Sequence, residues 1–425
     1  MKKYEETRDS GINWLGEIPA HWKLKKLKYC VALNTNEGEI EDITTRIALE
    51  NIESKTGKYL ATETPAFEGI GNLFNSGDVL FSKLRPYLAK VLHAETSGIA
   101  VGEVLVLTPD QDEYESRFLF YRLLSQSLID IVDSSTYGSK MPRASWGFIG
   151  ELKLPVPPLP EQRAIAAYLD RKTAQLDTLL AQKETLLQKL HQKRQALINE
   201  AVTQGLDPAA PRKPSGVAWL GDVPAHWEVK KLRYAVDFFN TVRVPLSSEE
   251  RGRMASRTYD YYGASGIIDK VEDYHFDGDY ILLAEDGANL LSRSTALAFK
   301  ATGKFWVNNH AHILRPKHGN LDYFVNLLES LDYSMYVTGS AQPKLTMGNL
   351  AEVILPVPPL GEQEIIQEHL QKISQKISKA TTAIHTQIQT LKAFRQSLIS
   401  EVVTGKVDVR PAVLAPEADL PLWQQ

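Results

Sequence analysis

The sequence has little of what disulfide-bonded, zinc-binding and membrane proteins need. Its 425 residues include a single cysteine, Cys30, which excludes a disulfide framework and a cysteine-built zinc site and is typical of a reducing cytosol. No apolar run approaches the roughly 20 residues of a membrane helix, and the polar start MKKYEETRDS is unlike a signal peptide. We therefore expect a cytoplasmic protein without membrane contact.

A surplus of positive charge is also missing. The chain has 48 basic and 52 acidic residues, which give a formal net charge of −4. The first 150 residues hold 17 basic and 21 acidic side chains. Because nucleic-acid-binding domains usually carry a basic patch, this balance gives no indication of DNA or RNA binding. Any such role must rest on local groups.

The motifs of several enzyme classes are absent. There is no G-x-x-x-x-G-K-[ST] phosphate loop, and Gly69-Ile-Gly71 is a lone G-x-G without a third glycine. The two Pro-Pro pairs are flanked by Val and Leu, unlike the Asp/Asn-Pro-Pro-aromatic motif of adenine methyltransferases. His310 and His312 lack a third metal ligand. We therefore predict no catalytic residue, no metal ligand and no cofactor in this chain.

What is present is an internal repeat, which identifies the chain as a tandem duplication. Three pairs of segments match: SGINWLGEIPAHWKLKKLKY (10–29) with SGVAWLGDVPAHWEVKKLRY (215–234), LPVPPLPEQ (154–162) with LPVPPLGEQ (355–363), and RQALINEAVTQGLD (194–207) with RQSLISEVVTGKVD (395–408). Between these segments few residues match, but those that match recur at a constant spacing. We therefore expect two similar units related by a pseudo-twofold repeat.

The repeat also weighs against a nuclease site. Pro109-Asp110 and the distant Glu151-Leu-Lys153 have the residue types of such a site. The second copy keeps Glu352 but follows it with Val353 and Ile354. A structural glutamate is the better interpretation.

The globular part of each copy is predicted to be a mixed α/β domain. Residues 30–150 and 235–350 carry short β-branched and aromatic runs separated by Gly and Asn. Helices are expected near Arg117–Val132 and Leu321–Ser330. The overall fold class is therefore α+β.

A long helix is predicted to follow each globular part. The Leu-Pro-Val-Pro-Pro-Leu blocks cannot lie inside a helix, because proline lacks the N–H and clashes with the preceding turn. After them, Glu161 and Glu362 each open about 44 residues without Gly or Pro. At 1.5 Å per residue, each helix would be roughly 66 Å long.

These elements give the expected division of the chain. It consists of a first globular domain (1–155), a first helix (156–205), a proline-rich extended linker (206–218), a second globular domain (219–356), a second helix (357–408), and a tail (409–425) that is a peripheral strap or disordered.

Both helices carry a heptad seam, which predicts a coiled coil between the two copies. Apolar residues recur every 3.5 positions on average over five heptads. The predicted seam residues are Leu169, Leu176, Leu180, Leu187, Leu190 and Leu197 in the first helix, and Leu370, Ile377, Ile384, Ile388, Leu391 and Leu398 in the second. A simple rigid spacer or dimerisation rod is the alternative interpretation.

A protein with two similar units, different surfaces and paired connecting helices could recognise two targets that lie a fixed distance apart. Duplex DNA fits this description, because each base pair presents a distinct pattern in the major groove. The candidate DNA-binding residues are Lys83, Arg85, Tyr87, Ser139, Lys140 and Arg143 in the first unit, and Arg257, Tyr262, Ser265, Ser340, Gln342 and Lys344 in the second.

Each candidate taken alone is more simply a solvated surface side chain. The paired loops Gly138-Ser-x-x-Pro-Arg143 and Gly339-Ser-x-x-Pro-Lys344 are stronger evidence, because their position is kept while neighbouring residues vary. Packing of this loop against the start of the helix is an alternative reason for its retention.

The chain resembles the specificity subunits of type I restriction-modification enzymes over essentially its whole length. The resemblance is carried by Trp14-Leu-Gly-x-Ile-Pro-x-His-Trp22 and its copy Trp219–Trp227, by both L-P-x-P-P-L-x-E-Q blocks, and by both R-Q-x-L-I-x-E-x-V-T helix ends. The stretches Tyr261–Gly266 and Asn308–His312 also look typical of a target-recognition domain.

This resemblance implies two target-recognition domains separated by two long conserved helices that form an antiparallel coiled coil. Each domain would read one half of an asymmetric, interrupted DNA sequence, and the helices would set the gap. The subunit would have no activity alone. It would bind two modification subunits, which use S-adenosylmethionine to methylate adenine N6, and two restriction subunits, which use ATP and Mg²⁺ in translocation and cleavage.

By the same resemblance, the helices would carry most contacts with the modification subunits, with Gln162, Arg163, Tyr168 and Arg171 as candidates on their non-seam faces. Two alternatives stay open. One is a coiled-coil scaffold for protein interactions without DNA specificity, and the other is an enzyme with an unrecognised site in one globular domain.

Overall fold

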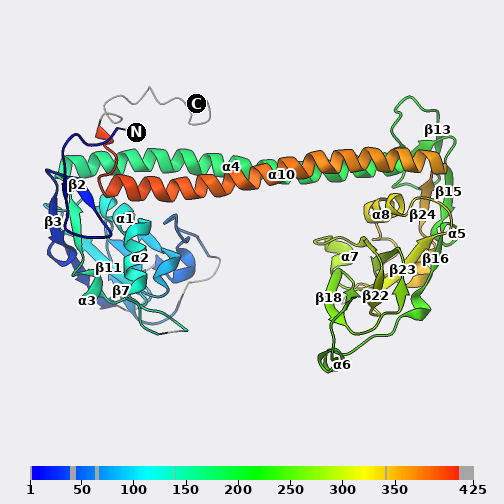
Figure 1. Ribbon diagram of the computed structural model, residues 1–425, viewed down its shortest axis with the longest axis horizontal. Helices are drawn as coiled ribbons and strands as arrows, with labels where there is room; N and C mark the ends of the chain where they lie inside the picture. The colour runs from blue at the N-terminus through cyan, green and yellow to red at the C-terminus, as the bar shows by residue number, and fades with distance from the viewer. Residues whose placement is uncertain (1, 39–44, 63–66, 139, 340–341, 411–425) are drawn as a thin grey trace. The chain divides into compact units, whose positions relative to one another are not determined.

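The computed structural model describes residues 2–38, 45–62, 67–138, 140–339 and 342–410 (Figure 1). The chain divides into two compact units, residues 1–183 with 385–425 (unit 1) and residues 184–384 (unit 2). Both divisions fall inside long helices, α4 (Leu159–Gln204) and α10 (Leu360–Val403). Each unit therefore contains the first part of one long helix and the last part of the other.

Unit 1 is built mainly from the first half of the chain. Its elements before α4 are β1 (Thr7–Asp9), β2 (Glu17–Pro19), β3 (Lys23–Lys26), η1 (Leu27–Tyr29), β4 (Val31–Asn34), β5 (Glu37–Gly38), β6 (Arg46–Ile47), η2 (Leu49–Asn51), β7 (Gly71–Phe74), β8 (Val79–Ser82), η3 (Pro86–Leu88), β9 (Val91–His93), β10 (Gly98–Ala100), β11 (Val104–Pro109), α1 (Ser116–Leu124), α2 (Gln126–Ser134), α3 (Trp146–Ile149) and β12 (Lys153–Val156).

Unit 2 repeats this plan between the two long helices. Its elements are β13 (Arg212–Pro214), β14 (Asp222–Pro224), β15 (Glu228–Lys231), α5 (Leu232–Ala235), β16 (Val236–Phe238), η4 (Asn240–Val242), α6 (Ser248–Gly252), β17 (Tyr259–Gly263), β18 (Gly266–Val271), β19 (Phe276–Asp277), β20 (Tyr280–Ala284), α7 (Asn289–Ser292), β21 (Ala298–Ala301), β22 (Lys304–Val307), β23 (Ala311–Pro316), α8 (Leu321–Ser330), α9 (Met347–Ala351) and β24 (Ile354–Val357).

Each unit holds two four-stranded sheets. One is antiparallel throughout, with the order β4-β11-β8-β9 in unit 1 and β16-β23-β20-β21 in unit 2. The other contains one parallel pair, β6 with β10 in unit 1 and β17 with β22 in unit 2. The strand added at the edge differs, because β5 pairs with β7 in unit 1 whereas β18 pairs with β17 in unit 2. The two domains thus share a frame and vary at the edge of the mixed sheet.

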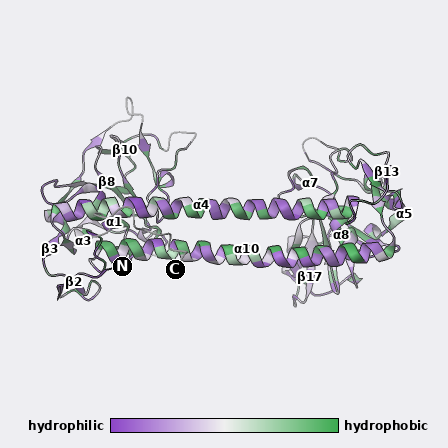
Figure 2. Ribbon diagram, turned by 90° about the horizontal axis from the view of Figure 1, so that it is seen from above, coloured by the Kyte–Doolittle hydropathy of each residue, from purple (hydrophilic) through white to green (hydrophobic). Residues whose placement is uncertain are grey.

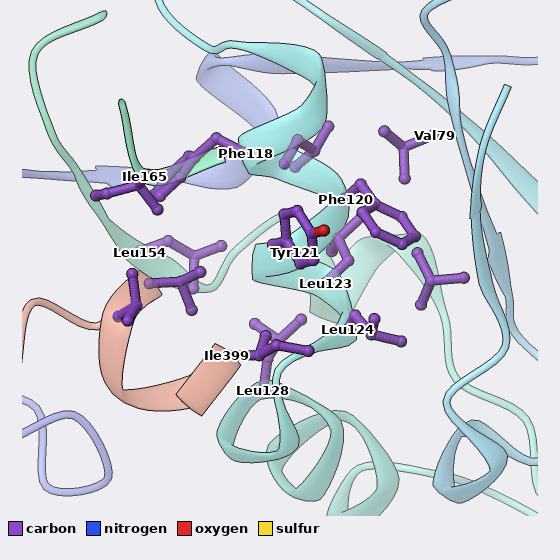
Figure 3. Packing of buried hydrophobic residues seen from close by; sticks show 14 of the residues in the cluster. Val79, Phe118, Phe120, Tyr121, Leu123, Leu124, Leu128, Leu154, Ile165 and Ile399 are labelled. Atoms are coloured by element: carbon purple, nitrogen blue, oxygen red, sulfur yellow. The ribbon is translucent and has the colours of Figure 1, made fainter. Parts of the chain in front are cut away.

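The main core of unit 1 joins the sheet to both long helices. Figure 3 shows Phe118, Phe120, Tyr121, Leu123 and Leu124 of α1 packed with Val79 of β8, Leu128 of α2, Leu154 of β12, Ile165 of α4 and Ile399 of α10. The last residues of α10 are therefore part of the core formed by the first half of the chain. In unit 2 the end of α4 has the same position, since Ala201 and Val202 belong to its main core.

The helix seam is buried within each unit. All twelve predicted seam residues are buried or partly buried. In unit 1, Leu169 and Leu176 of α4 share a core with Leu398 of α10, and in unit 2 Leu370 of α10 shares a core with Ala201 of α4. The start of one helix thus packs against the end of the other, so the segments are antiparallel. Figure 2 shows hydrophobic and hydrophilic residues alternating along both helices.

The predicted fold class, two mixed α/β domains with two long helices and an internal repeat, is confirmed. The helix predicted at Leu321–Ser330 is α8, while the one near Arg117–Val132 is broken at Ser125 into α1 and α2. Strand β13 lies within the predicted linker and pairs with β14, which lies in the predicted second globular domain. Residues 411–425 of the predicted tail lie outside the described residues. None of the helices in the described ranges is long and apolar enough to cross a membrane.

Candidate nucleic-acid interface

The repeated motifs build the frame that holds each candidate surface. The histidine of each Pro-Ala-His-Trp segment meets the glutamate of the Glu-Gln pair in the same unit. His21 Nε2 lies 2.7 Å from Glu161 Oε2, and His226 Nε2 lies 2.6 Å from Glu362 Oε2. The tryptophans that follow the histidines are fully buried. The first segment of each copy is therefore fixed to the first turn of its long helix.

The glutamine of each Glu-Gln pair connects the long helix to a short one. Gln162 accepts a hydrogen bond from the Glu115 N–H at 2.8 Å, and Gln363 accepts one from the Asn320 N–H at 2.9 Å. Both acceptor glutamines also donate to a proline carbonyl of the preceding Pro-Pro block. Gln162 and Tyr168 are buried within unit 1, so neither is exposed for contact with another subunit.

Glu151 is structural, as the repeat indicated. It pairs with Lys26 at 2.7 Å and with Lys28, and Glu352 has an equivalent pair of basic partners. Hydrogen bonds from the two lysines lower the pKa of Glu151 to about 2. Within the part of the chain that the structure describes, no group of three His, Cys, Asp or Glu side chains could hold a metal ion.

The residues that flank the two G-S-x-x-P-[Arg/Lys] loops are paired in the same way in both units. Bridges of β type between Tyr137 and Arg143 and between Thr338 and Lys344 close them. The glycine at the start of each loop has a φ of 89° or 85°, in the left-handed region that glycine tolerates. The repeated glycine is thus required by the turn itself.

Each loop is joined to the end of a sheet strand. The Arg85 N–H, just after β8, donates to the proline carbonyl of the first loop at 2.8 Å. The Gly287 N–H, just after β20, donates to the equivalent carbonyl at 3.0 Å. The structure therefore brings the strand-end and loop candidates together in each unit. Ser139 and Ser340 lie outside the described residues.

In unit 1 the candidate cations differ in how strongly they are held. Arg143 makes a two-pronged contact with Glu103, at 2.8 Å from Nη2 and 3.1 Å from Nε to the same oxygen. That hydrogen bonding holds the pKa of Glu103 below its usual value. Arg85 and Lys140 are exposed and have no ion pair with any residue that the structure describes, and Lys83 is half-buried beside them. Arg85 and Lys140 are thus the cations best placed to meet a ligand.

Exposed aromatic and apolar side chains flank these cations. Tyr87 is 45% exposed, Tyr137 64% and Met141 48%. The sequence prediction included only Tyr87, because a tyrosine and a methionine beside a loop carry no pattern of their own. Such side chains can contact bases or thymine methyl groups.

In unit 2 the loop cation faces a buried carboxylate. Lys344 Nζ lies 3.4 Å from Glu285 Oε1, and Arg243 Nη1 lies 2.5 Å from Glu285 Oε2. Burial alone would raise the pKa of Glu285, but Arg243, His312 and Lys344 together hold it below its usual value. Lys344 is about half exposed, so its ammonium group can still reach a ligand.

Both histidines of the Asn308–His312 stretch have protein partners. His310 Nδ1 lies 2.8 Å from Asp286 Oδ2 and is exposed. His312 is fully buried, with Nε2 2.7 Å from the Leu345 carbonyl, and burial lowers its pKa. His312 is therefore a core residue, and His310 is a surface residue that contacts Asp286, just after the end of β20.

The remaining candidates of unit 2 lie on its mixed sheet and loop. Arg257 is 55% exposed and pairs with Asp269 at 2.9 Å, a carboxylate that it shares with Arg251. Ser265 is exposed in the turn between β17 and β18, and Gln342 is exposed in the loop. These groups offer both donors and acceptors.

Tyr262 belongs to the core rather than to the surface cluster. Its ring stacks on Phe299 at 6.0 Å between centroids and meets Phe305 edge-on at 5.5 Å. It is half-buried, which raises the pKa of its hydroxyl. Only that hydroxyl remains a candidate for ligand contact.

A protein-family model described as the type I restriction modification DNA specificity domain matches residues 34–189 and 224–390. A type I restriction enzyme specificity subunit from Haemophilus influenzae is 34% identical over 33% of this chain and 36% of that relative. The EcoDI specificity subunit from Escherichia coli is 28% identical over 37% of this chain and 36% of that relative. The chain thus spans about a third of the length of these two relatives.

Longer matches are more distant. The MjaVIII specificity subunit from Methanocaldococcus jannaschii is 21% identical over 96% of this chain and 98% of its own. One chain of a solved type I R-M system matches with a TM-score of 0.68 at 18% identity, covering 92% of this chain and 99% of that one. The HsdS subunit from Thermoanaerobacter tengcongensis gives a TM-score of 0.52 at 18% identity, over 92% and 98%.

Proposed function

Because this chain belongs to the type I restriction-modification DNA specificity family, we propose that it is the DNA sequence-recognition subunit of such a complex. Each recognition domain reads one half of an asymmetric, interrupted DNA site. The chain itself carries out no chemistry. It directs adenine-N6 methylation by two modification subunits and, with two restriction subunits, ATP-dependent cleavage.

One observation carries this proposal: the same backbone frame presents different chemistry in the two units. Backbone hydrogen bonds put Lys83 beside Glu103 and Ala144 in unit 1, and Glu285 beside His310 and Leu345 in unit 2, with matching geometry. The matched side chains are Lys83, Glu103 and Arg143 in unit 1, and Glu285, His310 and Lys344 in unit 2. Base pairs differ in their pattern of donors and acceptors, so two such surfaces would select different sequences.

The modest charge of the chain fits a role inside a complex. With a net charge of −4, it has no overall surplus of positive charge with which to neutralise DNA phosphates. Modification subunits that clamp the duplex would supply part of that surface. S-adenosylmethionine would be held by the modification subunits, and ATP and Mg²⁺ by the restriction subunits.

We assign recognition and assembly to different segments of the chain. Recognition would belong to residues 1–155 and 219–356, and spacing and subunit binding to the helical segments 156–205 and 357–408. The strongest base-reading candidates are Arg85 and Lys140 in unit 1 and Gln342 and Lys344 in unit 2. A location in the cytoplasm, with access to DNA, is part of this proposal.

A map of N6-methyladenine in the source strain, with and without this gene, tests the proposal. We expect methylation to disappear at one interrupted, asymmetric motif, whose two halves identify the two targets. An unchanged map, in a strain whose modification subunits are expressed, would contradict the proposal and favour a protein-interaction scaffold.

A further inference from the structure

Strand β18 of unit 2 leaves two adjacent isoleucines uncovered. Ile267 is 54% exposed and Ile268 is 52% exposed. The strand lies at the edge of the sheet ordered β18-β17-β22-β19, so one side of it has no partner strand among the residues that the structure describes. Proteins usually protect such an edge with charged residues, proline or a covering element, because an apolar edge invites unwanted pairing. An uncovered apolar pair at this edge therefore indicates a contact surface.

A β-bulge places both isoleucines opposite the same residue. On β17, Tyr261 and Tyr262 pair with Asp269 and Ile267 of β18, and the register shifts between the two tyrosines. Ile268 is the extra residue of β18, so both isoleucines lie opposite Tyr262. Bulges re-aim side chains and are over-represented beside functional sites. The backbone of the hairpin therefore brings the two apolar side chains together.

The hairpin is joined to the candidate surface of unit 2 through Asn308. The Asn308 N–H donates to the Tyr262 carbonyl at 3.0 Å, and the Asn308 side-chain oxygen accepts from the His310 N–H at 2.8 Å. The His310 carbonyl in turn accepts from the Glu285 N–H at 2.9 Å. The Glu285 carboxylate lies 3.4 Å from Lys344 Nζ. The isoleucine pair thus continues the surface formed by the strand end and the loop.

The turn of the hairpin is fixed before any ligand binds. Ala264, its first residue, packs against the main core of unit 2. Ile268 lies over the backbone of Gly263, where an added Cβ would lie 3.1 Å from Ile268 Cγ2 and 3.4 Å from Asn308 Nδ2. A ligand would therefore have to order only side chains on this surface, which reduces the entropic cost of binding.

The charged side chains along the hairpin are already paired. Lys270 Nζ lies 2.9 Å from Asp260 Oδ1, and Arg251 and Arg257 each lie 2.9 Å from a carboxylate oxygen of Asp269. Next to its turn the hairpin therefore offers apolar surface and a serine hydroxyl rather than unpaired cations. Phosphate contacts are made largely by cations and other donors, so this part of the surface suits a base edge better than the DNA backbone.

The apolar pair is particular to unit 2. In the described part of unit 1, the edge strand β5 consists of Glu37 and Gly38, and neither has an apolar side chain. Groups kept in both copies, such as the Glu-Gln pair at the start of each long helix, build the frame. A group present in one copy can distinguish one half-site from the other.

We propose that Ile267 and Ile268 recognise thymine by its C5 methyl group, in the major groove of the half-site that unit 2 reads. Thymine is the base that presents a methyl group in this groove, and the groove is wide enough to admit a two-stranded β-ribbon. Contact between the isoleucines and the methyl group removes apolar surface of both from water. This inference rests on the proposed function and adds a specificity-determining contact to it.

Removing thymine methyl groups from the DNA tests this contact. The complex of the full-length chain with its modification subunits is bound to duplexes in which each thymine of the methylated motif, on either strand, is replaced in turn by uracil. The same series is measured with the double variant Ile267→Ala and Ile268→Ala. Ile70→Ala, the same change at an isoleucine of unit 1 that is 60% exposed, is the matched control.

We expect the loss of one methyl group in one half-site to weaken wild-type binding about threefold to fivefold, the effect of one buried methyl group. The double variant should bind thymine and uracil equally at that position, and the control should respond there like the wild type. All three chains should unfold at the same temperature, because the substituted isoleucines lie on the surface.

A wild-type complex that responds to no thymine methyl group, or a double variant that responds as strongly as the wild type, would overturn the proposal. Loss of self-association in the double variant, measured by sedimentation velocity, with an unchanged uracil response would assign the edge strand to contact between copies of the chain. A wild-type complex with no preference for the motif would instead contradict the proposed function.

Discussion

Single side chains in the two candidate surfaces are of two kinds: some are held by ion pairs within the protein, and others are available to a ligand. Arg143 is held by Glu103, and Arg257 shares Asp269 with Arg251. Arg85 is exposed at a backbone position with φ 50°, fixed by a hydrogen bond to the adjacent loop. Binding would therefore have to order only the side chain, at a cost of about 0.5–1.5 kcal/mol, and would break no ion pair among the residues that the structure describes, which favours Arg85 as a base contact.

Replacing Arg85 by alanine should therefore weaken the reading of one half-site only. If Arg85 makes a two-pronged contact with guanine, the loss is about 1–3 kcal/mol at that position. Binding of the assembled complex to duplexes with single base changes measures it. Lys344→Ala, in the other unit, should affect the opposite half. Equal losses on all sequences would assign either residue to phosphate contact.

His312 makes the stability of unit 2 depend on pH. Burial lowers the pKa of His312, which is packed beside Glu285, Arg243 and Lys344. The unfolded chain therefore takes up a proton first, near the usual pKa of 6.5. The stabilisation is complete above this pH and is lost as the pH falls toward the lowered value.

His312→Gln should remove that dependence. The free energy of unfolding of the wild-type chain should fall as the pH decreases below about 6.5, by up to about 1.4 kcal/mol per pH unit, while the variant stays flatter. Urea titrations at several pH values measure this slope. His191→Gln, an exposed change on α4, is the control. A variant as steep as the wild type would show that another group titrates.

At the scale of elements, each long helix is followed by a glycine with a positive φ, and the space around the two glycines differs. Gly405 has φ 76°, and a Cβ there would lie 2.3 Å from Pro19 Cδ. Gly205 has φ 77°, and its nearest neighbour would be Trp227 Cζ2 at 3.2 Å. The backbone strain is shared, whereas the clash with a rigid proline ring belongs to Gly405.

Gly405→Ala should therefore destabilise the protein more than Gly205→Ala. We expect losses of about 2–4 kcal/mol and about 1–2 kcal/mol, because a left-handed alanine costs about 1–2 kcal/mol and overpacking adds to it. Chemical unfolding of the two variants compares them directly. Equal losses would mean that the first unit relaxes around the added methyl group.

At the scale of the whole molecule, the repeat and the heptads predicted most of the architecture. The runs without Gly or Pro that begin at Glu161 and Glu362 start two residues after the observed first residues of α4 and α10. Which helix end completes which core could not be predicted, because it depends on contacts between residues such as Ile165 and Ile399, far apart in sequence. The pairing of Arg143 with Glu103 was missed for the same reason. The site residues themselves stay predictions.

If the two long helices set the distance between the half-sites, lengthening them should lengthen the gap in the DNA site. Seven residues inserted between Glu184 and Leu190, with a matching seven after Ile377, would keep the seam in phase, because the heptad is preserved. At 1.5 Å per residue the helical pair lengthens by about 10.5 Å, the rise of about three base pairs. The methylated motif should keep both half-sequences and gain about three base pairs between them. A four-residue insertion, which breaks the heptad, should abolish methylation, and an unchanged spacer in the seven-residue variant would exclude the helices as the element that sets it.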